Sequence, residues 1–296
     1  MNILLAFAWS PYTTAAYYAK AFRAMGHDVR TVGPSDAERW ASWPGARRYR
    51  LTGPHYSGEW GEWGPGVCVW IDAGGDWCAD LRDFGAPTIG YFIDSHSRLA
   101  QHVQNAPLFD KVFVAHRQYV DRIPGAEWLP VACDPDVHTP TVTGEPLYDV
   151  AFVGNTYGGA PMYAERRRLL ATLRERYKLR AESGMYFEGM ANVYASARVA
   201  FNVSTGGDLN MRVFEAMCSG TPLVTDTAPG SGLLDLFGYL EHLLVYFDNS
   251  PRCLWEQIDI LLSSRDAANR IAAAGRAEVV AHHTYAHRAA QMLAAL

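Results

Sequence analysis

The chain has 296 residues, of which 49% are hydrophobic and 19% are charged, and its formal net charge is -5. This length and composition suit two domains of ordinary size, each with its own core, better than one large domain. The net charge gives no general attraction to nucleic acid or to an anionic membrane. No apolar run reaches the length of a membrane span, and the first residues lack the basic flank of a signal peptide, so we expect a cytoplasmic protein.

The cysteines of the chain are odd in number and widely scattered. They contain no Cys-x-x-Cys pair, and no histidine spacing beside them suggests zinc. We therefore expect reduced, mostly structural thiols. The five are Cys68, Cys78, Cys133, Cys218 and Cys253.

In the first half of the chain, short apolar strands alternate with amphipathic helices. This alternation is typical of parallel sheets with helical crossovers. The predicted strands lie near residues 3–8, 29–32, 67–71, 88–93, 111–115 and 127–129. The predicted helices lie near residues 14–25 and 97–105.

The segment 40–66 interrupts this pattern, because it is too irregular for a simple crossover. Prolines, glycines and arginines separate six aromatic residues in it: Trp40, Trp43, Tyr49, Tyr56, Trp60 and Trp63. Aromatic faces stack on sugar rings and on unstacked bases. The segment is either a ligand-recognition loop or a surface loop pinned by buried tryptophans.

The second half repeats the alternation after a segment rich in Pro, Thr and Asp at residues 134–147, which predicts a domain linker. The predicted strands lie near residues 149–153, 199–203, 223–225 and 244–246. The predicted helices lie near residues 162–177, 187–197, 209–219, 254–263 and 267–282.

The helix predicted at residues 209–219 carries Arg212 and Glu215 on one face, and Gly220 is its expected C-cap. A cation beside a hydroxyl-binding carboxylate suits a nucleoside diphosphate. The alternative is an ion pair between residues three apart on a solvated helix face.

The segment 212–226, Arg-Val-Phe-Glu-Ala-Met-Cys-Ser-Gly-Thr-Pro-Leu-Val-Thr-Asp, resembles the signature of group 1 glycosyltransferases of the GT-B fold. It is most similar to the family-4-like branch that includes spore-maturation-type proteins. Segments 148–155 and 195–204 are similar to strands of the same family, whereas the resemblance is weak before residue 87.

The resemblance implies an α/β protein in which two Rossmann-like, parallel-sheet domains face each other across a cleft. Residues 1–133 would form the acceptor domain and residues 148–283 the nucleotide-sugar domain. Residues 134–147 would link them, and a helix at 284–296 would pack back on the first domain.

The resemblance also places Glu215 on the ribose hydroxyls of the donor. Family-4 members commonly carry two glutamates separated by seven residues, and Gly207 stands at the position of the first. The role of that first glutamate, close to the transferred sugar, then has only Asp208 beside it as a substitute. Asn210 completes the predicted donor residues of this segment.

A second group of donor residues is predicted where the strand at 149–153 ends. Gly154 and Asn155 open a glycine-rich turn that leads to a helix, and backbone N–H groups there can hold a pyrophosphate. Arg166 lies nearest that turn, and Arg212 is the stronger phosphate ligand. The alternatives are an ordinary turn and a solvated basic face at residues 166–168.

The strand ends of the first half supply candidates for the acceptor and for proton transfer. Asp94 and His96 follow a buried strand, and with Arg212 they form the predicted catalytic set. The alternative for Asp94 is an N-cap of the next helix. The predicted acceptor-binding residues are Trp9, Tyr12, Trp60, Asp72 and Asp76.

The resemblance, together with these residues, implies a glycosyltransferase that moves a sugar from a UDP- or GDP-sugar to an acceptor hydroxyl. We expect no metal and no cofactor, and retention of configuration, with inversion open. The acceptor would be a glycan, a small molecule or a modified nucleic acid, and the protein a monomer or homodimer. The alternatives are a nucleotide-sugar epimerase of the same fold and a non-catalytic nucleotide-sugar or glycan-binding protein.

Overall fold

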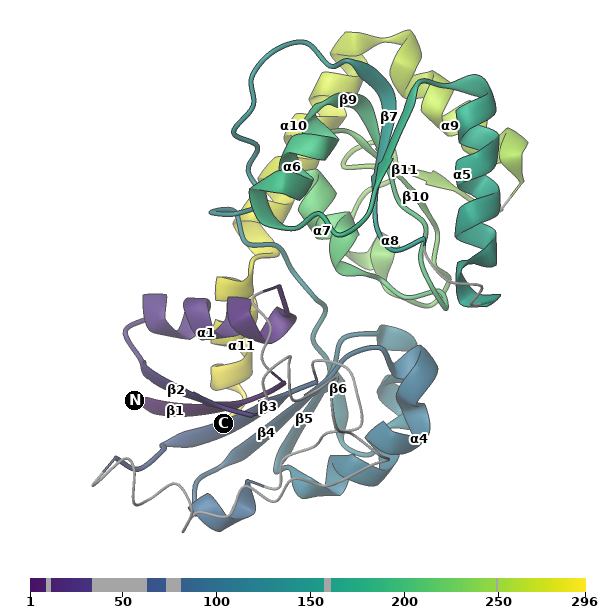
Figure 1. The fold of residues 1–296 in the computed structure, drawn as a ribbon. Helices are drawn as coiled ribbons and strands as arrows, with labels where there is room; N and C mark the ends of the chain where they lie inside the picture. Colours follow the sequence, from purple (N-terminus) through teal and green to yellow (C-terminus); the bar gives the residue numbers. More distant parts are fainter. Residues whose placement is uncertain (9–11, 34–62, 73–80, 157–160, 249) are drawn as a thin grey trace. The chain divides into compact units, whose positions relative to one another are not determined.

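The computed structural model describes residues 1–8, 12–33, 63–72, 81–156, 161–248 and 250–296. The chain divides into two compact units: residues 1–130 with 285–296, and residues 131–284, which include the segment predicted as the linker. Each unit is built on one parallel sheet flanked by helices (Figure 1). The cysteines among the described residues are all free thiols. No described helix combines the length and the apolar character that a bilayer crossing needs.

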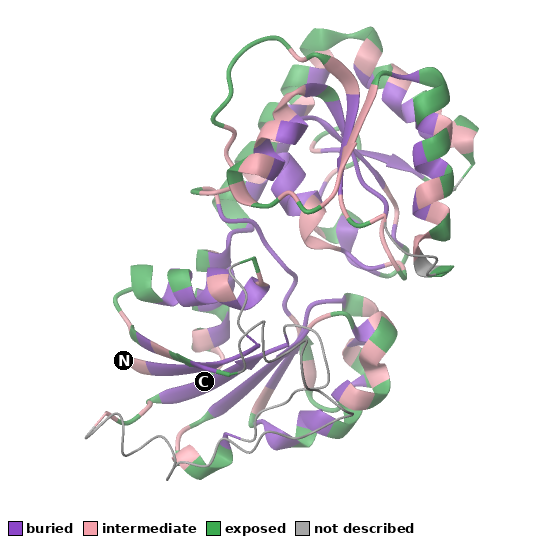
Figure 2. Ribbon diagram, in the orientation of Figure 1, coloured by how far each residue is buried: buried purple, intermediate pink, exposed green. Residues whose placement is uncertain are grey.

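The sheet of the first unit contains the six strands predicted for this half, with ends that differ by at most two residues. The strands are β1 (Asn2–Ala6), β2 (Asp28–Val32), β3 (Val67–Ile71), β4 (Thr88–Phe92), β5 (Lys111–Val114) and β6 (Ala126–Trp128). Their order across the sheet is β2-β1-β3-β4-β5-β6, and every neighbouring pair is parallel. Strands β3 and β4 are buried along their whole length, as expected for a sheet covered on both faces (Figure 2).

Among the described residues, three helices and three 3-10 turns complete the first unit. They are α1 (Thr14–Ala24), α4 (Ser95–Asn105), α11 (Tyr285–Ala294), η1 (Arg82–Phe84), η2 (Ala106–Leu108) and η3 (Arg117–Arg122). The C-terminal helix α11 packs along α1, where the rings of Tyr17 and Tyr285 stack at 4.9 Å. The buried Arg288 of α11 donates from Nε to the carbonyl oxygen of Pro130 at 2.9 Å. Helix α11 is therefore an integral part of the first unit.

The sheet of the second unit has five parallel strands in the order β11-β10-β9-β7-β8. They are β7 (Tyr148–Val153), β8 (Leu179–Glu182), β9 (Ala197–Phe201), β10 (Leu223–Asp226) and β11 (Leu244–Tyr246). Strand β8 is absent from the sequence-based prediction. It is a half-buried edge strand with charged side chains at Arg180 and Glu182, so it lacks the apolar run that marks its neighbours.

Helices cover both faces of this second sheet. They are α5 (Ala164–Arg176), α6 (Phe187–Ala195), α7 (Met211–Cys218), α8 (Leu233–Leu236), α9 (Pro251–Ser263) and α10 (Arg265–His282), with a 3-10 turn η4 at Pro161–Tyr163. Helices α5 and α9 cover one face, and α6, α7 and α10 cover the other (Figure 1). Helix α7 begins two residues later than predicted, and Gly220 follows it in the left-handed conformation expected of a C-cap glycine (φ 78°).

The chain changes direction across the second sheet at β7. From β7 it first adds β8 on one side, and it then returns to add β9 on the other. In open parallel sheets, ligands bind beyond the carboxyl ends of the strands at such a switch point. The loops after β7 and β9 therefore flank the expected binding site of this unit.

Candidate functional site

Arg166 of α5 turns inward toward the carboxyl ends of β7 and β9. It is only 3% exposed. Its Nη1 donates to the carbonyl oxygen of Asn155 at 2.6 Å, and its Nη2 donates to the hydroxyl of Thr205 at 2.6 Å. Arg168, two residues on, lies instead at the surface in an ion pair with Glu165. The solvated basic face considered from the sequence therefore describes Arg168 and not Arg166.

Arg212 reaches the same place from the first turn of α7. Its Nε donates to the side-chain oxygen of Asn202 at 2.9 Å, and its Nη2 to the carbonyl oxygen of Val203 at 3.2 Å. Arg166 also donates to the Val203 carbonyl, at 3.4 Å. Both guanidinium groups lie over the ring of Phe152, at 5.6 and 5.7 Å from its centroid. Two cations thus share one carbonyl oxygen and one aromatic ring.

The two guanidinium groups raise each other's electrostatic free energy. Burial, and next the charge of Arg212, lower the pKa of Arg166 to about 10. The groups that accept their hydrogen bonds are neutral carbonyls, an amide and a hydroxyl, and neither arginine has an ion-pair partner among the described residues. Two partly buried cations without an ion-pair partner among the described residues favour an anion beside them.

Glu215 lies one turn further along α7. Burial raises the pKa of its carboxyl to about 7, and the charge of Arg212 acts in the opposite direction. Its ion-pair partner is the ring of His138, with Nε2 at 3.6 Å from Oε1. Arg212 binds Asn202 and Val203, so the alternative of a solvated Arg212–Glu215 pair does not describe this helix.

The loop between β9 and α7 contains the remaining predicted donor residues of this unit. Gly206 and Gly207 adopt left-handed conformations (φ 69° and 74°), and Asp208 is 3% exposed. Asn210 is the N-cap residue of α7 but makes no side-chain cap hydrogen bond. The oxygen and nitrogen of its amide are buried and have no partner among the described residues. These atoms, close to the helix N-terminus, are available to a ligand.

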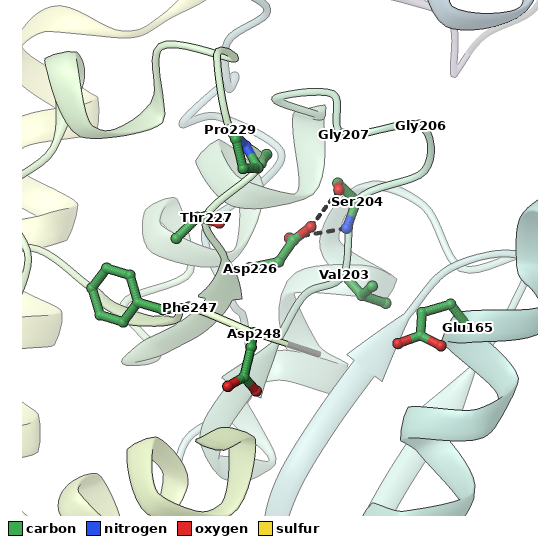
Figure 3. A pocket seen from close by; sticks show the side chains of 11 residues that line it. Glu165, Val203, Ser204, Gly206, Gly207, Asp226, Thr227, Pro229, Phe247 and Asp248 are labelled. Atoms are coloured by element: carbon green, nitrogen blue, oxygen red, sulfur yellow. Dashed lines mark hydrogen bonds between the residues drawn. The ribbon is translucent and has the colours of Figure 1, made fainter. Parts of the chain in front are cut away.

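A pocket of about 370 Å³ borders this loop at Gly206 and Gly207 (Figure 3). It is lined by Glu165, Val203, Ser204, Gly206, Gly207, Asp226, Thr227, Ala228, Pro229, Phe247 and Asp248. Asp226 accepts hydrogen bonds from the backbone N–H and the hydroxyl of Ser204 (Figure 3). Three carboxyl groups make this pocket unsuitable for phosphate, because like charges repel. Arg166 and Arg212, which do not line this pocket, are better placed to meet an anion.

Asp94, at the end of β4, has an unusual backbone. Its φ of 56° lies in the left-handed region, which aspartate tolerates better than most residues. Its N–H donates to Nε2 of His116 at 3.3 Å, and its exposed carboxyl group makes no cap hydrogen bond to α4. His96 follows, half-buried, in the first turn of α4. The N-cap alternative thus holds for the position of Asp94 but not for its carboxylate.

Asp72, predicted to contact an acceptor, is 2% exposed and held by two basic groups. Its carboxylate lies 2.5 Å from Nη1 of Arg98 and 3.0 Å from Nε2 of His102. Nδ1 of His102 lies 3.0 Å from the hydroxyl of Ser95, also on α4. Ser95 and His102 are seven residues apart, which puts both on one face of α4.

The other predicted acceptor residues are described only in part. Tyr12 is 42% exposed. Trp9, Trp60 and Asp76 lie outside the described residues. Acceptor binding by this set stays a prediction.

The family model described as Glycosyl transferase-like matches residues 144–294, which is more than half of the chain and includes both arginines and Glu215. The chain belongs to this glycosyltransferase family. No curated protein matches the sequence.

Solved structures resemble this glycosyltransferase along its whole length. Sucrose-phosphate synthase from Thermosynechococcus elongatus has a TM-score of 0.68 at 13% identity, over 100% of this chain and 98% of that one. HepE from Anabaena in complex with UDP-glucose has a TM-score of 0.64 at 10% identity, and the match covers 100% of both chains. An alpha-glucosyltransferase in complex with UDP-glucose and DNA containing an abasic site has a TM-score of 0.65 at 11% identity. That match covers 100% of this chain and 99% of the other.

At these identities, the likeness shows the fold alone. The prediction of a GT-B, α/β protein with two parallel-sheet domains is confirmed, as are the resemblance to group 1 glycosyltransferases and the enzyme class. Membership of the spore-maturation-type branch stays a prediction.

Proposed function

We propose that this glycosyltransferase binds a nucleoside-diphosphate sugar on its second unit and transfers the sugar to an acceptor hydroxyl. The observation that carries the proposal is the pair Arg166 and Arg212, whose charges have no ion-pair partner among the described residues. A diphosphate supplies the missing negative charge. UDP is the favoured nucleotide, because UDP-glucose occupies HepE and the alpha-glucosyltransferase, and GDP is the alternative.

The other donor contacts follow from the position of this pair. The diphosphate also lies at the N-terminus of α7, where backbone N–H groups and the helix dipole favour an anion. Glu215, three residues after Arg212, accepts the ribose hydroxyls. Gly154 and Asn155 border the phosphates, while Asp208 and Asn210 border the transferred sugar.

The main chemical task of this site is to stabilise the negative charge that develops on the leaving group. When the bond to the sugar breaks, the nucleoside diphosphate gains negative charge, and fixed cations stabilise that transition state more than the ground state. Arg166 and Arg212 supply the positive charge for this purpose, so we propose a metal-independent reaction. We also propose that the configuration is retained, with inversion as the alternative. Asp94 or His96 would accept the acceptor's proton if it were inverted.

Nucleotide titration calorimetry tests the donor site. Wild-type protein should bind UDP or GDP, and Arg212→Met and Arg166→Met should each weaken binding about tenfold or more, because a charge-assisted contact to phosphate is lost. Arg168→Met is the matched control, since that residue pairs with Glu165 at the surface. Binding that is unchanged in both of the first two variants would rule out this diphosphate site.

Incubation with radiolabelled UDP- and GDP-sugars separates the proposed reaction from its rivals. A transferase joins the label to an acceptor and releases the nucleoside diphosphate. An epimerase releases the nucleotide and a free epimeric sugar. A binding protein releases neither. Activity in the presence of EDTA, and the anomeric configuration of the product by NMR, test the proposals of metal independence and retention.

A further inference from the structure

We propose that His138 is a positioning residue that holds the Glu215 carboxylate in the orientation that receives the ribose. This inference rests on the proposed function, because it assumes that Glu215 binds the ribose of the donor. His138 lies in the segment that the sequence predicted to be a linker, and neither its residue type nor its spacing marked it as part of a site. Both residues belong to the second unit.

A tight turn fixes the ring of His138. The backbone N–H of His138 donates to the carbonyl oxygen of Asp134 at 2.9 Å, and the backbone N–H of Asp134 donates to Nδ1 of His138 at 3.0 Å. Because Nδ1 accepts this hydrogen bond, the neutral ring carries its proton on Nε2. That atom is the one that faces Glu215 Oε1, at 3.6 Å. The turn therefore selects the tautomer that presents an N–H to the carboxylate.

Helix α10 ties this turn to the helix that carries Glu215. Arg276 donates from Nε to the carbonyl oxygen of Cys218, the last residue of α7, at 3.0 Å. Its Nη2 donates to the hydroxyl of Thr139, the neighbour of His138, at 3.3 Å. One side chain thus fixes the distance between the turn and α7, and with it the distance between the imidazole and the carboxylate.

The environment of Glu215 explains why such a contact matters. Glu215 is 6% exposed, and Arg212, the cation whose charge acts on its carboxyl group, is hydrogen-bonded to Asn202 and Val203. A buried carboxylate without a donor nearby is costly to ionise, and no hydrogen bond then fixes its orientation. The His138 ring is fully buried and rigidly held, so it fixes one carboxylate oxygen and leaves the other for the ribose hydroxyls.

Two amide substitutions separate the two nitrogens of the ring. His138→Asn keeps an acceptor near the position of Nδ1 for the Asp134 N–H but is too short to reach Glu215. His138→Gln places an N–H donor near the position of Nε2. The inference predicts that His138→Asn weakens the binding of the ribose and that His138→Gln weakens it less. A role confined to the turn predicts the reverse order.

The readout is the ratio of the affinities for UDP and for 2′,3′-dideoxy-UDP, measured by calorimetry. The same ratio is measured for GDP and 2′,3′-dideoxy-GDP. We expect His138→Asn to weaken UDP about tenfold and to change dideoxy-UDP less than twofold, because only the first ligand carries the hydroxyls. On a Glu215→Gln background the same substitution should leave the UDP affinity within twofold, since the group it positions is gone.

The outcomes distinguish this inference from the function on which it rests. If Glu215→Gln binds both nucleotides as wild-type does, the ribose assignment of Glu215 is wrong. If Glu215→Gln selectively loses UDP while His138→Asn keeps the wild-type ratio, the role of His138 is overturned and the donor site stands. Equal weakening of both nucleotides in His138→Asn also overturns it, because a damaged turn would then be the cause.

Discussion

Gly154 lies against Arg212 so closely that a methyl group on its α-carbon would be 2.7 Å from Nη1 of the arginine. The same methyl group would be 2.9 Å from the ring of Phe152, over which the guanidinium lies. The glycine that follows β7 therefore makes room for the cation and for its aromatic support.

Gly154→Ala should displace Arg212 and weaken nucleotide binding about tenfold, the effect of losing one charge-assisted hydrogen bond. Calorimetric titration with UDP checks this. Gly189→Ala in α6 is the control, because a methyl group there meets only Met185, at 3.7 Å. If Gly154→Ala binds UDP as tightly as Gly189→Ala does, the fit between residues 154 and 212 has no bearing on the ligand.

Glu215→Gln should make the nucleotide-free protein more stable at pH 8 and leave it nearly unchanged at pH 4. Burial raises the pKa of Glu215 from 4.5 to about 7, so ionisation destabilises the folded protein increasingly as the pH rises between these values. The shift corresponds to roughly 3 kcal/mol above pH 7. Thermal unfolding midpoints at the two pH values measure it, and an equal change at both would contradict the burial of an ionised carboxylate.

Inorganic pyrophosphate should stabilise the wild-type protein against heat, because an anion between Arg166 and Arg212 relieves their repulsion and binds only the folded state. At a concentration one hundred times the dissociation constant, the gain is about 2.7 kcal/mol. Arg212→Met should abolish most of it. Sodium chloride of the same ionic strength serves as the control, and a pyrophosphate effect of equal size in Arg212→Met would place the anion elsewhere.

Deletion of residues 284–296 should destabilise the first unit and leave nucleotide affinity largely intact. The deletion removes the Tyr17–Tyr285 stack and the hydrogen bond from Arg288 to Pro130, both inside that unit. Hydrogen exchange should accelerate in α1, which α11 contacts, and not in β9 or β10. We expect sugar transfer to be lost with the acceptor domain. A truncated enzyme with full transferase activity would contradict that.

Substitutions at Asp94 separate its backbone from its carboxylate. Asp94→Ala should cost about 1 kcal/mol of stability, because alanine avoids the left-handed conformation, whereas Asp94→Asn should cost less. Both should reduce transfer if the carboxylate moves a proton, and neither should change nucleotide affinity. Loss of nucleotide binding in Asp94→Asn would show that our division of the substrates between the two units is wrong.

The strands of both sheets were predictable where their sequence is continuously apolar. Val67–Ile71 and Leu244–Tyr246 were located to the residue, because a strand covered on both faces is apolar throughout. Strand β8 was not, since Leu179–Glu182 lies at an edge and alternates polar with apolar side chains over only four residues. A pattern so short does not distinguish a strand from a loop.

The candidate site divides in the same way. Arg212 and Glu215 were predictable, because their helical spacing and the surrounding signature indicate a ligand. The approach of Arg166 to the turn after β7 was also predicted, whereas its contacts with Val203 and Thr205 and the contact of His138 with Glu215 were not, because they depend on segments that meet only in the folded chain. The link from Asp72 to His102 spans thirty residues and likewise has no local signal.

The carbonyl oxygen of Val203 receives both guanidinium groups. An oxygen of the main chain is present whatever side chain the residue bears, so mutation at position 203 cannot delete this acceptor while the local backbone conformation is maintained. Drift in the amino acid at 203 should therefore be tolerated within the limits of core volume, whereas insertion or deletion in the segment that follows β9 should not be. Selection on this part of the enzyme therefore acts on the backbone conformation after β9 rather than on the identity of the side chain at position 203.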